Sequence, residues 1–151
     1  MYKVGIIANP SAGKDIRRLV ASGRVISNQE KANIITRFIR GLIFKGIKNF
    51  YFMPDKSGLY MPSIEEFKND INSFILDTKY YDGPDQTLLS AELISKLGCD
   101  CVLVLGGDGT NRLVAKKLVK SLLFHYQLVQ IMHFLLILIQ LLQDLHLHII
   151  F

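Results

Sequence analysis

The chain has 151 residues, half of them hydrophobic, and a formal net charge of +5. This length suits one domain with a proper core. Scattered Lys and Arg residues without a dense cluster disfavour nucleic acid as a partner and favour a small anionic ligand. Cys99 and Cys101 have neither a CxxC pair nor further ligand cysteines, so we interpret them as buried thiols on one strand face in a reducing compartment. Because Met1 leads straight into a strand, without a signal peptide, we expect a cytoplasmic protein.

The first predicted strand runs over 4–8 and is followed by a loop over 9–14, which Pro10 and Gly13 punctuate. The spacing from Ala8 to Lys14 nearly matches a Walker A loop, but Asp15 stands where a Ser or Thr hydroxyl must hold magnesium. We therefore favour a polar loop at the C-terminal end of a parallel strand over a true P-loop. The main basic concentration is read either as a solvated face or as an anion contact. It consists of Lys14, Arg17, Arg18 and Arg24.

The middle of the chain alternates between predicted helices and strands. The first is a helix over 28–45 that ends at Gly46, followed by a strand over 50–53. A helix over 63–74, with Ser63 and Glu66 as a capping box, and a short strand over 74–76 come next. The last is a helix over 85–97, which Asp85 caps and Gly98 ends. A strand, a helix and a following strand make a βαβ unit with a right-handed crossover.

A continuous apolar strand is predicted over 101–105, where the sequence reads Cys-Val-Leu-Val-Leu, and it runs into Gly-Gly-Asp-Gly-Thr-Asn over 106–111. Such a strand is typical of a parallel sheet, buried on both faces. The glycines allow positive φ angles and the close approach of another molecule, which suits phosphate. Asp108 fits either a chemical role, as a general base or a partner of a phosphate-bound cation, or a structural one, as the cap of a helix starting near Asn111.

These elements predict an α/β fold with a Rossmann-like parallel sheet. Ligands of open α/β sheets bind at the carboxyl edge of the strands. We therefore expect the loop after Ala8 and the loop after Leu105 to face the same crevice.

The motifs resemble the ATP-NAD kinase family, which belongs with the diacylglycerol and sphingosine lipid kinases, and within it the acetoin catabolism protein X-like group. The similarity extends from Lys3 to about Lys120. It is carried, in matching order, by Gly5-Ile6-Ile7-Ala8-Asn9-Pro10, Lys14-Asp15-Ile16-Arg17-Arg18-Leu19-Val20, Asn28-Gln29-Glu30-Lys31, Phe52-Met53-Pro54-Asp55 and Gly106 to Lys116.

This resemblance implies a nucleotide-binding domain over 1–120 that uses ATP with a divalent cation such as magnesium, and NAD as a candidate acceptor. Asp108 would then be the catalytic base. The phosphate loop would consist of Gly106, Gly107, Gly109, Thr110 and Asn111, and a second wall of Asn9, Ser11, Gly13 and Lys14. No protein metal site is expected, and the resemblance leaves homo-oligomers open for intact members.

The tail over 121–151 departs from this pattern, because it contains no Lys, Arg, Glu, Gly, Pro, Ala, Asn or Thr. The family resemblance implies a further Thr-Gly-Thr-Asn-Asn loop and a β-rich substrate domain instead. The codons over 125–134, read from the third base of the His125 codon, permit Leu-Ser-Thr-Gly-Thr-Asn-Asn-Ala-Phe. We therefore infer a frameshift between about Lys116 and His125, and we expect the chain as written to be inactive.

Two readings of the tail follow from its residues. Its histidines, His125, His133, His146 and His148, are not interpreted as a zinc site, because selection for the kinase did not shape them. The stretch over 121–143 is long and apolar enough for a membrane helix, but its His and Gln residues are costly there, so a membrane partner is not expected. Two rival functions stay open: a diacylglycerol-type lipid kinase, and a non-catalytic nucleotide-binding protein.

Overall fold

Five parallel strands form a single sheet in the computed structural model of the chain. The structure describes residues 1–12, 26–78, 83–118 and 122–125, and of Asp108 and 122–125 it describes the backbone only. The strands are β1 (Lys3–Ala8), β2 (Asn49–Phe52), β3 (Asn72–Ile75), β4 (Cys101–Leu105) and β5 (Leu122–His125). Their order across the sheet is β3-β2-β1-β4-β5. The chain therefore moves outward from β1 through β2 to β3, and then returns to the other side of β1 for β4. The predicted Rossmann-like parallel fold is confirmed.

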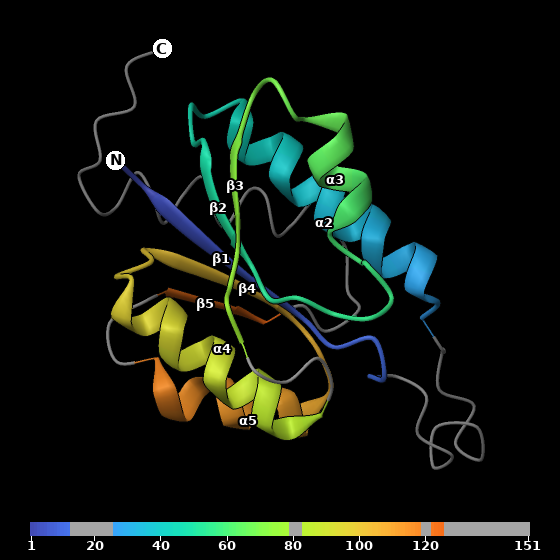
Figure 1. The fold of residues 1–151 in the computed structure, drawn as a ribbon, viewed down its shortest axis with the longest axis vertical. Coiled ribbons are helices and arrows are strands. Elements are labelled where there is room, and N and C mark those ends of the chain that lie inside the picture. The colour runs from blue at the N-terminus through green and yellow to red at the C-terminus, as the bar shows by residue number, and fades with distance from the viewer. Residues whose placement is uncertain (13–25, 79–82, 119–121, 126–151) are drawn as a thin grey trace.

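Helices cover both faces of this sheet (Figure 1). Helices α2 (Asn28–Ile43) and α3 (Met61–Glu66) lie on one face, and α4 (Pro84–Lys96) and α5 (Asp108–Lys117) lie on the other. Arg40 of α2 pairs with Glu66 of α3, and Lys117 of α5 contacts Glu92 of α4 with 2.5 Å between Nζ and Oε1. Each helix pair is thus linked at its surface as well as through the core.

The core divides into two clusters because successive side chains of a strand point to opposite faces. On β1, Ile6 belongs to the cluster under α2 and α3, whereas Ile7 belongs to the cluster under α4 and α5. Ile6 lies opposite Phe52 of β2 and Leu103 of β4 in the strand register. All of these side chains are at most 2% exposed, as the double burial of a parallel strand requires.

The start of α2 and the ends of α2 and α4 agree with the sequence. Ser27 caps α2, because its Oγ accepts from the N–H of Glu30 at 3.1 Å. Gly46 and Gly98, the predicted stops of α2 and α4, have φ angles of 79° and 65°. In this left-handed region a glycine avoids the steric penalty of a side chain.

The predicted caps of the other two middle helices are wrong. Helix α4 is capped by Gly83, not by Asp85, which instead lies in its first turn. Helix α3 begins at Met61 and already ends at Glu66, so Ser63 lies inside it and its Oγ donates to the carbonyl of Tyr60 at 2.7 Å. Pro62 suits the first turn of a helix, where no N–H is needed. The remainder of the predicted helix over 63–74 includes the start of strand β3.

The cysteines lie on different faces of the sheet, contrary to the sequence prediction. Cys99 precedes β4 and packs in the cluster under α4 and α5, whereas Cys101 packs against the cluster under α2 and α3. Both thiols are free. Burial raises the pKa of Cys99 to about 11 and also raises that of Cys101, so both are held as neutral thiols at neutral pH.

Strand β5 continues the sheet past Lys120, where the predicted domain ends. It pairs with β4 in parallel, with Leu122 opposite Cys101 and His125 opposite Val104. Residues 126–151 lie outside the described residues, and so do His133, His146 and His148 of the tail. Among the described residues, no helix has both the length and the apolar composition needed to span a bilayer.

Candidate functional site

Two loops meet where the strand order reverses. The N–H of Asn9, directly after β1, donates to the carbonyl of Leu105 at 2.9 Å and so extends the pairing of β1 with β4. Its side-chain Nδ2 donates to Thr110 Oγ1 at 3.3 Å. Because β1 and β4 belong to the two halves of the sheet, this contact lies at the topological switch point, where open α/β sheets bind their ligands. The structure therefore brings together the two loops that the sequence placed in one crevice.

The described part of the loop after β1 is a closed turn. The N–H of Ser11 donates to Asn9 Oδ1 at 2.9 Å, the N–H of Ala12 donates to the Asn9 carbonyl at 3.2 Å, and Pro10 has no N–H. The main-chain donors of 9–12 are thus satisfied within the protein. Ser11 is exposed, and its hydroxyl is a donor within reach of a ligand here. Gly13, Lys14 and the three nearby arginines, Arg17, Arg18 and Arg24, lie outside the described residues.

The loop after β4 leads directly into helix α5. The helix begins at Asp108 with Gly107 as its cap, so Asp108 is not the cap of a helix starting near Asn111, and that hypothesis is wrong. The first N–H groups of a helix have no partners within it, and glycine has no side chain to cap them. Together with the helix dipole, they favour an anion. The side chain of Asp108 lies outside what the structure describes.

Of the glycines of this loop, Gly106 is needed for space, and none is needed for a positive φ angle. None of Gly106, Gly107 and Gly109 has a φ in the left-handed region, contrary to the expectation from the sequence. A Cβ on Gly106 would lie 2.4 Å from Cβ of Thr110, so Gly106 permits the close packing of Thr110. A Cβ on Gly107 or Gly109 would have no neighbour within 4 Å among the described residues. Open space thus adjoins the first turn of α5.

Thr110 and Asn111 anchor the start of α5. They are 8% and 9% exposed. Thr110 Oγ1 accepts from Asn9, and Asn111 Nδ2 donates to the carbonyl of Gly107 at 3.0 Å. Both side chains therefore hold the loop in place, and we interpret them as positioning residues and not as groups that contact a bound ligand.

Lys31 is a site residue that sequence reasoning missed. It lies in the first turn of α2, is 3% exposed, and donates from Nζ to the carbonyls of Asn9, Pro10 and Ala12 at 3.0, 2.9 and 2.6 Å. A signal was present in the sequence: Lys31 precedes Ile35 by four residues and Phe38 by seven, so it falls on the apolar stripe of the helix. A cation on such a stripe must find polar partners in the interior.

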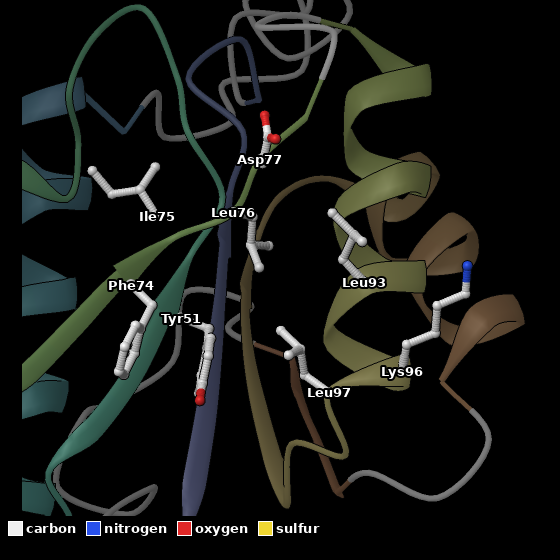
Figure 2. Close-up of a pocket in the computed structure, with 8 residues that line it drawn as sticks. All are labelled: Tyr51, Phe74, Ile75, Leu76, Asp77, Leu93, Lys96 and Leu97. Atoms are coloured by element: carbon white, nitrogen blue, oxygen red, sulfur yellow. The ribbon is translucent and has the colours of Figure 1, made fainter.

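A hollow elsewhere on the surface does not include this site. It has a volume of about 330 Å³ and is formed by β2, β3 and α4 (Figure 2). Tyr51 and Phe74 stack on one side of it with 4.8 Å between ring centroids, and Leu93 of α4 and Leu97, directly after α4, lie on the other side. None of its lining residues belongs to the loops after β1 and β4.

The described residues hold no group of three or more His, Cys, Asp or Glu side chains that could bind a metal ion.

The fold and its paired loops define an open, parallel α/β domain with a glycine-rich loop at the switch point. No protein-family model matches the chain. It is 33% identical over 121 residues to acetoin catabolism protein X of Cupriavidus necator, and the match covers 76% of this chain and 34% of that protein. This similarity supports the grouping with acetoin catabolism protein X-like proteins. The chain spans about a third of the length of this curated relative.

Proposed function

We propose that the crevice between the loops after β1 and β4 binds the triphosphate of ATP together with a divalent cation, and that the ancestral reaction is an NAD kinase-like phosphoryl transfer. The observation that carries this proposal is the hydrogen bond from Asn9 Nδ2 to Thr110 Oγ1, which joins the two loops at the switch point. The glycine-capped start of α5 and the open space beside Gly107 and Gly109 support it, because phosphate needs both donors and close approach.

In this proposal each loop has a different task. The first turn of α5 supplies main-chain N–H groups to the phosphates, and Thr110 and Asn111 hold that turn in place. The turn over 9–12 uses its own N–H groups internally and therefore acts as a wall, to which Ser11 adds a hydroxyl. Asp108, at the first position of α5, would accept the proton of the acceptor hydroxyl as phosphoryl transfer proceeds.

The acceptor rests on the family resemblance, which favours the adenosine ribose hydroxyl of NAD over the hydroxyl of a diacylglycerol. Phosphorylation of NAD but not of diacylglycerol by a full-length relative would support this choice. The alternative is nucleotide binding without turnover, and ATP binding without any phosphoryl transfer would identify it. For this chain we expect binding of ATP.

A valine at Gly107 tests the phosphate loop. Gly107 has φ −84° and ψ −178°, which valine tolerates, and in the part of the chain that the structure describes no atom lies within 4 Å of the added Cβ. The Gly107→Val chain should therefore fold but lose ATP binding, measured by calorimetry with Mg–ATP. Ser73→Val, on the exposed outer strand β3, is the matched control and should bind as the parent chain does. Unchanged affinity in Gly107→Val would mean that this loop does not hold the phosphates.

A further inference from the structure

We propose that Lys31 is a positioning residue of the nucleotide site: its buried ammonium group gathers the carbonyls of the turn over 9–12 and thereby sets the contact between Asn9 and Thr110. This inference rests on the proposed function for its consequence on nucleotide binding, but the contact itself can be tested without any nucleotide.

The first step is the environment of the ammonium group. Lys31 is 3% exposed, and the three carbonyl oxygens within 3.0 Å of Nζ match the three N–H donors of a lysine. Burying an ammonium group is costly unless such partners replace water. Without the cation, the partial negative charges of these carbonyl oxygens would repel one another. The ammonium group and the turn over 9–12 therefore stabilise each other.

The second step leads from the turn to the site. The carbonyl, Oδ1 and backbone N–H of Asn9 are all hydrogen-bonded. The carbonyl accepts from Lys31 and Ala12, Oδ1 accepts from the N–H of Ser11, and the N–H donates to the carbonyl of Leu105. These bonds orient the side chain so that Nδ2 is left to donate to Thr110 Oγ1. Lys31 on helix α2 is therefore connected to the first turn of α5, across the sheet, through a single residue.

The third step separates positioning from direct contact with a phosphate. A lysine that bound a ligand phosphate would direct its N–H groups toward the crevice. Here Lys31 Nζ donates to three carbonyl oxygens of the protein itself, at 2.6 to 3.0 Å. The effect of Lys31 on a nucleotide is then exerted through the turn over 9–12, in which Asn9 makes the contact with Thr110.

A double-mutant cycle on the full chain tests this route. We expect Lys31→Met to weaken Mg–ATP affinity about ten-fold, since a charged hydrogen-bond centre is lost. In an Asn9→Ala background the same substitution should change the affinity less than two-fold, because the route is already broken. Lys48→Met, an exposed lysine before β2, removes the same charge at the opposite edge of the sheet and should leave the affinity unchanged.

Nuclear magnetic resonance of the nucleotide-free chain gives the independent readout. In Lys31→Met, the side-chain amide signals of Asn9 and the backbone signal of Thr110 should move, whereas in Lys48→Met they should not. If Lys31→Met does not fold, Lys31→Arg keeps the charge but cannot converge three carbonyls on one nitrogen, and the same shifts are expected.

The outcomes separate the two proposals. A parent chain that does not bind Mg–ATP overturns the proposed function, and the resonance shifts still decide the role of Lys31. Unmoved Asn9 and Thr110 signals in a folded Lys31 variant overturn the positioning role. An equal loss of affinity with and without Asn9 also overturns it, because Lys31 would then act on the nucleotide directly.

Discussion

Asp108 occupies the first position of helix α5, next to open space and at the positive end of the helix dipole. If it is the base, Asp108→Asn in a catalytically active form of the protein should keep the fold and reduce phosphoryl transfer by about 10²- to 10⁴-fold. The amide preserves the shape of the side chain but cannot accept a proton. The measurement is steady-state turnover, with thermal unfolding as the control. Turnover equal to that of the parent would remove Asp108 from the chemistry.

Cys99 makes the stability of the fold sensitive to high pH. Burial raises the pKa of its thiol from 9.0 to about 11. Between these values the unfolded chain releases the proton while the folded chain retains it, so the free energy of unfolding falls as the pH rises from 9 to 11. Denaturant midpoints across this range should decline more steeply for the parent than for Cys99→Ala. Parallel pH profiles would contradict the assignment.

At the scale of elements, helix α4 packs on β1 where the strand has no side chain. A Cβ on Gly5 would lie 2.8 and 2.9 Å from two carbons of Ile94, which is fully buried. Gly5→Ala should therefore lower the free energy of unfolding by roughly 1–3 kcal/mol, through overpacking. Chemical denaturation measures this change. Gly109→Ala adds the same methyl group where no described residue has an atom within 4 Å, and it should not destabilise the chain.

Strands β1, β2 and β4 and the C-terminal ends of α2 and α4 were predictable because they depend on local signals. The apolar run over 101–105 is buried on both faces, and Gly46 and Gly98 adopt the left-handed conformation that their positions after helices imply. Helix α3 was predicted with the wrong limits because the Ser63 and Glu66 spacing imitates a capping box. Glu66 instead pairs with Arg40, 26 residues earlier in the chain, and no local pattern contains that contact.

The location of the candidate site was predictable, but the contacts that hold its loops in place were not. Two polar loops after parallel strands indicate one crevice, and the bond from Asn9 to Thr110 agrees with it. The dependence of the turn on Lys31 could not be read from spacing alone, since it requires three carbonyls from another element to converge on one nitrogen. The glycine requirement at Gly106 likewise comes from the packing of Thr110.

At the scale of the whole molecule, the gene tests the organisation of the chain. The frame that begins at the third base of the His125 codon should encode a Thr-Gly-Thr-Asn-Asn stretch and then open coding sequence. The continuation should contain Gly, Pro, Ala and charged residues at globular frequencies, because a further domain needs turns and a solvated surface. Reading the nucleotide sequence is the measurement. Codons that forbid the shifted motif would remove the frameshift, and kinase activity of the present chain would show that no further domain is needed.

The contact between Asn9 and Thr110 also determines when the site can exist during folding. The two residues are 101 positions apart, so their meeting closes almost the whole described chain into one loop. Loop closure of this length costs entropy before any contact repays it. Strand β4 must therefore dock on β1 before the crevice forms, and a nascent chain that ends before α5 lacks one side of it. Appearance of ATP binding during refolding should thus coincide with the slowest structural phase, after the β1–α2–β2 half has formed.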